Sequence, residues 1–543
     1  MNVACGGAEV GARTPMTVWR QGTLMTSVQK ADRTKPAAYV PETPSPGPSL
    51  KVLDELFARL HDQEIRYCHW KSNEHLGPSL VGDTDVDVLV DRKAMVSLTR
   101  ILGETNFKRF VVKPGRGYPG IEDYVGFDSA TGTLSHLHVH YQLTLGEKFL
   151  KGHRLPWEEL YLSTRIRDER YGIYVTDPHL ELLVLIVRAV MKLRARDRAL
   201  EILGKPYFAG GMLRELRWLA DRTDRGRLQE VAAGLVGENA ARLLPVMLAG
   251  RRPTVRQLQA FGRRAEPALS TYRLYGAADT IRQMTTREWR AIWWKVKNWY
   301  QGAPTKSTRT LPQGGLFVAV LGVDGAGKST LTSALADWLS HEVAVTTTYG
   351  GSGKGSASLP RGLMQKAAAW RRRLRGATGA PRPAAQNYTV PDRPPSLARI
   401  VWLLVLARER RRRAAEARRA RALGMVVVSD RLPQSQFPGW NDGPRLQPWV
   451  QDGSAIRRFA ARREASVFRL VDLVPPDLVI KLHISPQVAS QRKPETPQQQ
   501  ILNGARMVRS LQFPPTTRIL ELDAEQPLAD VVLQAKRAIW DSL

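Results

Sequence analysis

The stretch GVDGAGKST, from Gly322 to Thr330, has the residue types and spacing needed to bind a phosphate chain. Glycine lets the backbone pass close to phosphates, so that amide N–H groups and the start of a helix face the anion. Lys328 would reach the β- and γ-phosphates, and Ser329 would place its hydroxyl on Mg²⁺. The alternative is an ordinary glycine-rich turn, but the full G-x-x-x-x-G-K-S pattern predicts a nucleoside triphosphate site. The expected nucleotide-binding residues are Gly322, Val323, Asp324, Gly325, Ala326, Gly327, Lys328, Ser329 and Thr330.

The residues around this motif indicate a strand, a tight turn and a helix. Leu316 to Val320 form an apolar run directly before it, and apolar residues recur at helical spacing from Ser329 to Leu339. Further along, MVVVSDR is typical of a buried strand that ends in Asp430 and Arg431. The simplest interpretation of that acid and base is an ion pair at a strand end, and the alternative is a place in the phosphate site.

A second candidate for chemistry lies near the N-terminus, where residues 84–88 alternate with period two. Asp85 and Asp87 therefore project from one face of a strand. Two adjacent carboxylates repel each other unless a cation or hydrogen-bond donors lie between them, and a divalent metal is the usual answer. The surrounding pattern predicts a helix over 52–62, a short strand near 66–70, a strand over 85–90 and a helix over 92–103.

Three histidines share one face of another predicted strand. His136, His138 and His140 alternate with apolar residues, so their imidazoles point the same way. Beside Asp85 and Asp87 they could form a mixed nitrogen and oxygen site, better suited to Mn²⁺ or Zn²⁺ than to Mg²⁺. The alternative is a polar strand face turned to solvent.

The composition limits the class of protein. A chain of 543 residues is too long for one core, which predicts two or three domains. The charge, 81 basic minus 51 acidic residues or +30, would favour nucleic acid, an anionic membrane or a polyanion as partner. Much of the excess is Arg in an Ala/Arg-rich background, which is typical of a GC-rich genome, and phosphate substrates account for another part. Nucleic acid stays an open but disfavoured partner.

No apolar run approaches the roughly 18 residues that span a bilayer, the longest being Ile400 to Leu406. Cys5 and Cys68 are the only cysteines, so no disulfide framework is expected. A soluble protein of the reducing cytoplasm is predicted, without a signal peptide. The true start could be Met16 or Met25. A homodimer is compatible with the sequence, which leaves the oligomeric state open.

Changes in composition predict five segments. Residues 1–50 lack periodicity and indicate a disordered tail. An α+β domain is expected over 51–178, followed by a helix-rich extension over 179–300. A glycine- and proline-containing linker over 301–314 leads into the second domain, 315–543.

The extension ends in REWRAIWWKVKNWY, residues 287–300, in which apolar and basic residues occupy different faces of a helix. Such a helix could lie on an anionic membrane surface. Packing between two domains is the interpretation we favour. The apolar stripe consists of Trp289, Ile292, Trp293, Val296 and Trp299.

Residues 52–190 resemble the nucleotidyltransferase superfamily, in which a Gly-Ser-type turn precedes an Asp-x-Asp strand and a neighbouring strand adds a third carboxylate. The resemblance implies that Ser72 holds a triphosphate and that Asp85 and Asp87 bind Mg²⁺. The sequence departs from the pattern at Lys71, where the family has Gly, and at His138, where an acid is expected. Nucleotidyl transfer is therefore left open.

Residues 315–543 resemble the thymidylate kinase group of P-loop nucleoside monophosphate kinases. The resemblance rests on the order GVDGAGKST, a long Arg-bearing helix at 399–424, VVVSDR, PDLVIKLHISPQVASQRK and ILELDAEQPLADVV. It implies an α/β P-loop kinase fold with a parallel sheet, ATP and Mg²⁺, and phosphoryl transfer to a nucleotide or another small acceptor.

The resemblance also implies roles for single residues. Lys328 would stabilise charge on the transferring phosphoryl group, and Ser329 would hold Mg²⁺. Asp324 would contact the acceptor near its sugar. Asp430 would close the Mg²⁺ region, and Arg431 would clamp the acceptor phosphate with its planar fork.

Two further roles fall on arginines. Either Arg408 or Arg410 corresponds to the helix arginine that faces the acceptor, and spacing does not choose between them. Arg492, followed by Lys493, opens the segment that corresponds to the lid of the family, from which it would reach ATP on closure.

The sequence departs from thymidylate kinases where they recognise the base. Leu321 replaces an acid before the loop, Tyr349-Gly350-Gly351 replaces a Glu-Pro-Gly segment, and Leu432 replaces an aromatic residue. The lid is short and contains Gln498 to Gln500. We therefore expect a kinase with another acceptor. The alternatives are a thymidylate kinase proper, and an ATP-binding switch or scaffold whose arginine runs at 371–373 and 410–413 contact nucleic acid or a polyanion.

Overall fold

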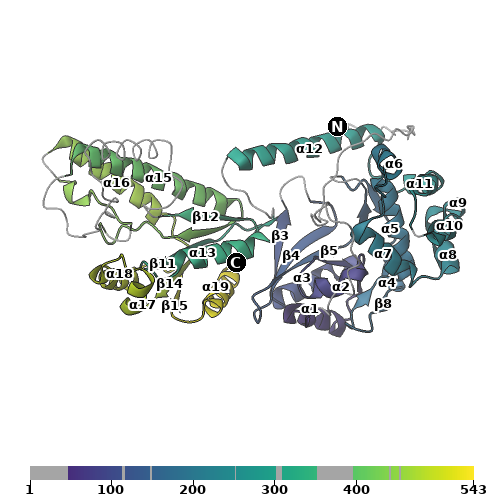
Figure 1. Cartoon of the computed structure of the whole chain (residues 1–543), viewed down its shortest axis with the longest axis horizontal. Coiled ribbons are helices and arrows are strands. Elements are labelled where there is room, and N and C mark those ends of the chain that lie inside the picture. The colour runs from purple at the N-terminus through teal and green to yellow at the C-terminus, as the bar shows by residue number, and fades with distance from the viewer. Residues whose placement is uncertain are drawn as a thin grey trace, which may run out of the picture. The chain divides into compact units, whose positions relative to one another are not determined.

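The computed structural model describes residues 47–112, 117–146, 150–250, 252–300, 309–350, 395–439, 442–451 and 454–543. The predicted tail up to residue 46, the glycine-rich loop at 352–355 and the arginine run at 371–373 lie outside these residues. The described chain forms two compact units. The first consists mainly of residues up to 107, 114–126 and 135–302, and the second of 108–113, 127–134 and 303–543 (Figure 1).

The first unit begins with a mixed sheet that carries helices. Its strands run in the order β4-β5-β2-β1-β9-β8, with β2 antiparallel to β1 and parallel to β5. The elements are α1 (Lys51–Asp62), β1 (Tyr67–His69), η1 (Asn73–His75), α2 (Leu76–Leu80), β2 (Val86–Val90), η2 (Arg92–Ala94), α3 (Met95–Glu104), β4 (Ile121–Phe127), β5 (Leu134–His140), β6 (Leu143–Leu145), β7 (His153–Leu155), α4 (Glu158–Ser163), β8 (Ile166–Arg167) and β9 (Tyr174–Val175).

The helical part of the first unit is built around α5 (Pro178–Lys192). Asp177 starts this helix by accepting a hydrogen bond from the backbone N–H of His179 at 2.8 Å, and Pro178 suits the first turn. Most side chains of α5 are buried, and α7, α8 and α11 pack against it. The other helices are α6 (Ala195–Ile202), α7 (Gly210–Ala220), α8 (Arg225–Val236), α9 (Glu238–Ala241), α10 (Leu244–Ala249), α11 (Val255–Ser270) and α12 (Ala277–Tyr300).

Helix α12 contains the predicted apolar stripe. Trp289, Ile292, Trp293 and Val296 are all exposed, with Trp289 at 71%. In the described part of the chain, no helix has both the length and the apolar character needed to cross a membrane.

The second unit contains a five-stranded sheet in the order β12-β13-β11-β14-β15, and every pairing in it is parallel. The three inner strands β13, β11 and β14 are mostly apolar and buried because helices cover both faces of the sheet, whereas the edge strands β12 and β15 are more polar. The predicted α/β class with a parallel sheet is confirmed. The elements are β3 (Phe107–Val112), β10 (Arg309–Thr310), β11 (Phe317–Gly322), α13 (Lys328–Ser340), β12 (Val345–Tyr349), α15 (Leu397–Ala422), β13 (Val426–Asp430), η3 (Gln447–Trp449), α16 (Ala455–Asp472), β14 (Leu478–His483), α17 (Pro486–Arg492), α18 (Gln498–Ser510), β15 (Arg518–Asp523) and α19 (Leu528–Ser542).

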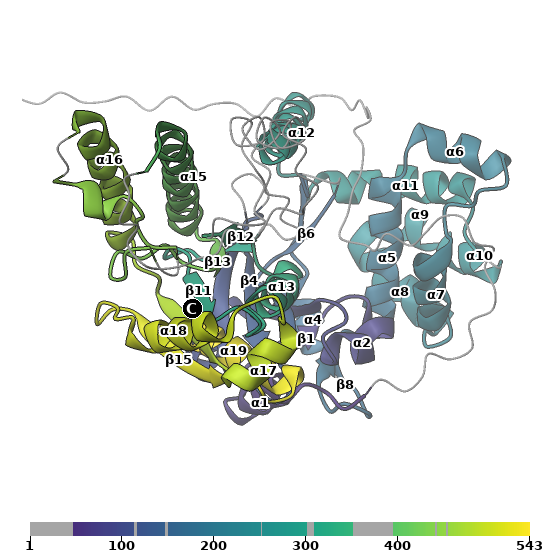
Figure 2. The same ribbon diagram turned by 60° about the vertical axis from the view of Figure 1, so that its left-hand side comes forward.

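Helices cover both faces of this parallel sheet. Ala417 of α15 and Val508 of α18 join Ala319 of the central strand β11 in one apolar core. Helices α13 and α19 pack on each other, α13 against β11 and α19 against β14. Helices α15 and α16 lie side by side in both views (Figure 2). The carboxyl ends of β11 and β13 thus open on the edge where the glycine-rich loop begins.

Two predicted segment boundaries are wrong in detail. Residues 309 and 310, expected in a linker, form β10 and pair antiparallel with Val112 and Val111 of β3. Leu50, expected in a disordered tail, is buried and its N–H donates to the Leu80 carbonyl at 2.9 Å. In both places, polar or turn-forming neighbours in the sequence obscure the pattern of a short ordered segment. That segment pairs with residues far along the chain.

A paired substitution tests the close packing at the start of β11. A Cβ on Gly315 would lie 1.9 Å from the Met425 carbonyl oxygen, so Gly315→Ala must push two backbone segments apart. We expect it to lower the free energy of unfolding by about 1–3 kcal/mol. Gly103→Ala is the control, because a Cβ there meets nothing within 4 Å on an exposed helix and should stabilise by about 0.5–1 kcal/mol. Equal effects of both variants in chemical denaturation would contradict the packing.

Candidate functional site

The glycine-rich loop connects β11 to α13 and turns at two residues with positive φ, Gly325 at 90° and Gly327 at 88°. This left-handed backbone is the reason glycine is needed there. Helix α13 then begins at Lys328, so its first backbone N–H groups face the loop. The predicted strand, turn and helix are therefore present in the expected order.

Lys328 is folded back onto the loop. Its ammonium group donates to the Val323 carbonyl oxygen at 2.7 Å and lies 3.5 Å from Asp324 Oδ1. The residue is only 7% exposed. Burial, together with the nearby Arg431 cation, lowers the pKa of Lys328 to about 8 although Asp324 opposes the shift. A buried ammonium with so few acceptors is poised to accept phosphate oxygens as further partners.

Ser329 and Asp430 meet at the edge of the sheet. β11 and β13 run parallel with Val320 opposite Asp430, which brings the end of β13 beside the loop. Ser329 Oγ donates to Asp430 Oδ2 at 2.6 Å, whereas the buried Asp430 Oδ1 has no hydrogen-bond partner among the described residues. A hydroxyl and a carboxylate with an unused oxygen are the ligand types that Mg²⁺ takes. The pair therefore fits this ion.

A line of alternating charges, here called the ion-pair chain, extends from the loop. Arg431 Nη2 donates to Asp324 Oδ1 at 2.5 Å, and Arg431 Nη1 lies 3.6 Å from Asp442 Oδ2. Arg410 Nη2 donates to Asp442 Oδ1 at 3.3 Å. The chain thus consists of Lys328, Asp324, Arg431, Asp442 and Arg410.

The charges of the ion-pair chain support one another. Burial disfavours the Arg431 cation, yet Asp442 and Asp324 raise its pKa above the ordinary value. Burial likewise opposes the charge of Asp324, but Arg431 and Lys328 hold its pKa below the usual range. Arg431 also has a φ of 74°, which is unusual for a residue other than glycine. The surrounding structure therefore fixes this guanidinium beside the loop.

The structure separates the two candidate helix arginines. Arg410 is 5% exposed and belongs to the ion-pair chain, whereas Arg408 is exposed on α15. Asp442 was not predicted, because it lies in a turn-like sequence without a chemical pattern. Arg492, the predicted lid arginine, ends α17 and donates to the Ala524 carbonyl at 3.2 Å from both Nη1 and Nη2, so it is not joined to the ion-pair chain.

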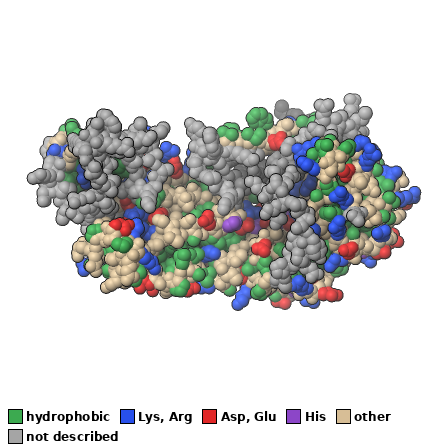
Figure 3. Space-filling view, in the orientation of Figure 1, with side chains coloured by type: hydrophobic (Ala, Val, Ile, Leu, Met, Phe, Trp, Pro, Cys, Tyr) green, Lys and Arg blue, Asp and Glu red, His purple; other side chains and the backbone are tan. Residues whose placement is uncertain are grey.

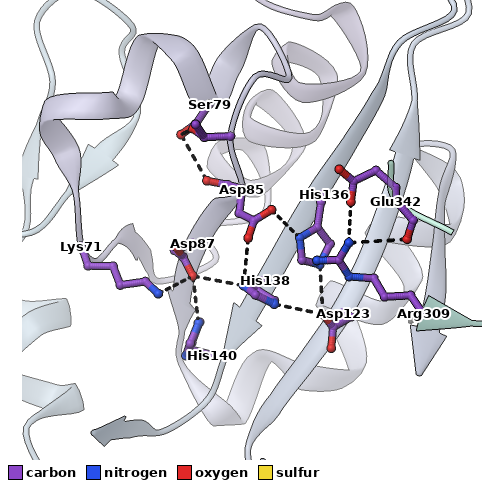
Figure 4. Close-up of polar contacts among 11 residues, drawn as sticks. Lys71, Ser79, Asp85, Asp87, Asp123, His136, His138, His140, Arg309 and Glu342 are labelled. Carbon is purple, nitrogen blue, oxygen red and sulfur yellow. Dashed lines mark hydrogen bonds and ion pairs between the residues drawn. The ribbon is translucent and has the colours of Figure 1, made fainter. Parts of the chain in front are cut away.

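The predicted strand residues of the first unit come together in a dense polar group, called here the histidine–aspartate cluster. In β2 and β5, Asp87 pairs with His138 in register. Figure 4 shows the side chains converging from β2, β4 and β5. The histidine–aspartate cluster consists of Asp85, Asp87, Asp123, His136, His138 and His140.

The interpretation of this strand face as turned to solvent is wrong. His136 is 2% and His140 1% exposed, and His138 is half-buried. Burial lowers the pKa of His140 to about 3, so this imidazole is neutral and donates from Nε2 to Asp87 Oδ1 at 3.2 Å. Burial opposes the charge of His138, but its contacts with Asp123 and Asp87 raise its pKa to about 9. Alternation alone could not show that other polar groups, and not water, face these imidazoles.

Asp123 is the member of the histidine–aspartate cluster that the sequence analysis missed. It lies on β4, and its Oδ1 is 3.0 Å from His136 Nε2 and 2.9 Å from His138 Nε2. His138 occupies the place where the nucleotidyltransferase pattern has its third acid, and Asp123 reaches it from the next strand. The acidic pair Glu122 and Asp123, directly before the apolar residues Tyr124 and Val125, was the available signal in the sequence.

Lys71 and Ser72 differ from the roles implied by the resemblance. The Lys71 ammonium group lies 2.9 Å from Asp87 Oδ1, beside the imidazoles of His138 and His140. Ser72 donates to Glu215 Oε1 at 3.2 Å, which puts a carboxylate where a triphosphate was expected. Mg²⁺ takes oxygen ligands and water, so this surrounding of Asp87 does not fit it.

Further cations lie around Lys71. Burial lowers the pKa of Lys151 to about 7 and that of Lys192 to about 8, and Lys71 and Arg188 add to both shifts. Asp87 opposes the shift of Lys151 only in part. An anionic ligand beside Asp87 would relieve this repulsion.

Glu181 on α5 supports the turn that contains Ser72. Its carboxylate accepts hydrogen bonds from the backbone N–H of Asn73 at 2.9 Å and from Asn73 Nδ2 at 2.6 Å. Burial, aided by Glu215, raises the pKa of Glu181 from 4.5 to about 7, although the Asn73 hydrogen bonds oppose the shift. The carboxyl group is thus held partly protonated near neutral pH.

The raised pKa of Glu181 predicts a pH dependence of stability. The folded protein keeps this proton to higher pH than the unfolded chain, so the stabilisation is complete below pH 4.5 and is lost as the pH rises through 7. We expect the free energy of unfolding to fall by about 3 kcal/mol from this group. Urea denaturation from pH 4.5 to 8 measures the slope, which Glu181→Gln should remove. An identical slope in both proteins would contradict the assignment.

No family model matches the sequence. The chain is 30% identical over 233 residues to the uncharacterized ATP-binding protein YghS of Escherichia coli K12, a match that spans 42% of this chain and 93% of YghS. It is 28% identical over 241 residues to the uncharacterized ATP-binding protein YghR of the same strain, spanning 43% and 92%. Among solved structures, the crystal structure of APE1195 aligns with 42% of this chain and 97% of its own, at 16% identity. The TM-score of this alignment is 0.21.

Proposed function

We propose, from the premise that this chain belongs to the same family as the ATP-binding protein YghS, that it binds ATP and transfers the γ-phosphoryl group to a small acceptor. One observation carries the proposal. The buried Lys328, the unused oxygen of Asp430 and the fixed guanidinium of Arg431 converge on one edge of the parallel sheet. Phosphoryl transfer depends on positioning and on charge stabilisation, and these groups supply both.

The topology of the second unit supports a P-loop kinase fold. From the central strand β11 the chain passes first to β12 and β13 on one side and then to β14 and β15 on the other. Ligands of such sheets bind at the carboxyl ends of the strands, where the direction of winding changes. That edge is where the glycine-rich loop and the ion-pair chain lie.

Each residue has a defined task in the proposed reaction. Lys328 exchanges the Val323 carbonyl for phosphate oxygens when ATP binds, and the N–H groups at the start of α13 face the same phosphates. Ser329 and Asp430 would hold Mg²⁺, and the ion would neutralise phosphate charge there.

The acceptor side is formed by the ion-pair chain. Asp324 is ionised and lies beside Lys328, so an acceptor hydroxyl or sugar can donate a hydrogen bond to it. Arg431 presents a fixed cation to an acceptor phosphate. Arg410 does not face the acceptor. It pairs with Asp442, which in turn pairs with Arg431 and helps to position it. A nucleotide or another small phosphorylated or hydroxylated compound fits these groups.

The first unit is proposed to have the nucleotidyltransferase-like fold, with the antiparallel pair β1 and β2 and the parallel strand β5 at its centre. Because the surroundings of Ser72 and Asp87 fit neither a triphosphate nor Mg²⁺, nucleotidyl transfer is not part of the proposed function.

The switch or scaffold function receives less support. In the described part of its arginine runs, Arg410 is internal and Arg413 donates to the Tyr349 carbonyl at 2.9 Å. On the face shown in Figure 3, Lys and Arg side chains are dispersed among acidic and other side chains over the helices of the first unit. Neither feature is typical of a continuous basic surface for nucleic acid.

Lys328→Ala tests the proposed reaction. ADP formation is measured with Mg²⁺ and ATP against thymidine monophosphate, other nucleoside monophosphates and fractions of a small-metabolite extract. Loss of the buried cation should lower acceptor-dependent ADP formation by about 100-fold or more. Lys51→Ala, which removes an exposed lysine, should leave the rate unchanged. Turnover that is equal in the wild-type protein and in Lys328→Ala, or that needs no acceptor, would contradict the proposal.

Arg410 and Arg408 offer a matched pair on one helix. Arg410→Lys keeps the charge but loses the planar fork that bonds Asp442, so Arg431 is held less firmly. We expect kcat/KM for the acceptor to fall by about tenfold, with the KM for ATP little changed. The exposed Arg408→Lys should behave as wild type. If the two variants have the same kinetics, the ion-pair chain does not position the acceptor site.

A further inference from the structure

We propose that the histidine–aspartate cluster binds one divalent transition-metal ion of the Zn²⁺ type through Asp85, His136 and His138. The three side chains offer ligand atoms that all lie within 4.8 Å of one another. This inference concerns the first unit and does not depend on phosphoryl transfer by the second.

Asp123 fixes which ring nitrogens are available. A carboxylate accepts hydrogen bonds and cannot donate them when ionised. Its Oδ1 lies 3.0 Å from His136 Nε2 and 2.9 Å from His138 Nε2, so each ring donates its Nε2–H to Asp123. In a neutral imidazole the other nitrogen then presents a lone pair. A metal ion that binds at Nδ1 takes the place of any proton on that nitrogen, so both Nδ1 atoms can be ligands.

These two Nδ1 atoms face a second carboxylate. His136 Nδ1 lies 2.8 Å from Asp85 Oδ1. His138 Nδ1 lies 3.9 Å from Asp85 Oδ2 and 3.3 Å from Asp87 Oδ1. Lone pairs on nitrogen and carboxylate oxygen repel at such distances unless a cation lies between them. Either protons or one metal ion can provide that positive charge.

The spacing of the rings favours the metal ion. The ring centroids of His136 and His138 are only 4.2 Å apart, and His136 is almost fully buried. Protonating both rings would place two like charges side by side in a medium that screens them poorly. A single divalent ion satisfies both nitrogens and Asp85 without that repulsion.

The ligand types select the class of ion. Two imidazoles and one carboxylate suit Zn²⁺ and its neighbours, whereas Mg²⁺ prefers oxygen ligands and water. Three protein ligands leave a position open for water or an anionic ligand. A second ion at Asp87 is disfavoured because Lys71 and His140 already contact that carboxylate.

Asp123 is a positioning residue for this ion. Carboxylates that accept a hydrogen bond from a ligating imidazole orient the ring and increase its basicity, and their loss weakens metal binding by about 10–100-fold. Asp123 contacts two of the rings at once. Its substitution therefore tests the arrangement without removing a ligand.

The test titrates the full-length chain, freed of metal with a chelator and kept without nucleotide, with Co²⁺ and Zn²⁺. We expect one equivalent of Co²⁺ to bind with visible d–d absorption, one equivalent of Zn²⁺ to displace it, and millimolar Mg²⁺ to leave it in place. Absence of stoichiometric Co²⁺ binding, or displacement by Mg²⁺, would overturn the proposal.

Variants locate the ion. His136→Ala should weaken Co²⁺ binding by about 100-fold or more, and Asp123→Asn by about 10–100-fold with a shifted absorption spectrum. His341→Ala, which removes an exposed histidine, controls for adventitious binding. Circular dichroism verifies that each variant is folded. If Co²⁺ binds Asp123→Asn and the wild-type protein with equal affinity and the same spectrum, the ion does not lie in the histidine–aspartate cluster.

Discussion

The mutual neutralisation of buried charges is the constraint on which the candidate phosphate site depends. In the ion-pair chain Asp324 and Asp442 each lie between two cations, and Arg431 lies between these two carboxylates. Removing one member of such a buried pair typically costs about 3–5 kcal/mol, because the partner is left without a counterion. Arg431, the central member of the ion-pair chain, also has a left-handed backbone conformation. The same charges that stabilise the edge of the sheet would recognise ATP and its acceptor.

In the histidine–aspartate cluster three carboxylates meet, and Lys71 and three imidazoles lie against them. A nucleotidyltransferase-like site would balance its acids with Mg²⁺ and a triphosphate. Here imidazole nitrogens lie among the carboxylates, a mixture of ligand types that suits Zn²⁺ better than Mg²⁺. In each unit, charged side chains therefore gather at the place where the proposed ligand or ion would bind.

The sequence predicted those features that depend on neighbours along the chain. The strand, turn and helix around Lys328 and the shared face of Asp85 and Asp87 follow from local spacing, and the structure has both. The sequence analysis missed Asp442 and Asp123, because each reaches its site from a different segment and belongs to no periodic pattern of its own. The sequence also did not predict the burial of the histidine face. Polar and apolar residues alternate along the strand in the same way whether water or other polar groups lie opposite the imidazoles. The spacing of residues along the chain predicts a motif, but only the folded structure shows which charged side chains meet.

The central claim is that the second unit transfers a phosphoryl group instead of only binding or hydrolysing ATP. The most direct measurement incubates the full-length protein and Mg²⁺ with ATP labelled by ¹⁸O in its γ-phosphoryl oxygens and with a small-metabolite extract, and follows the label by mass spectrometry. The account predicts that the labelled phosphoryl group appears in a discrete organic product. Label recovered only in inorganic phosphate, or only in unreacted ATP, would contradict it.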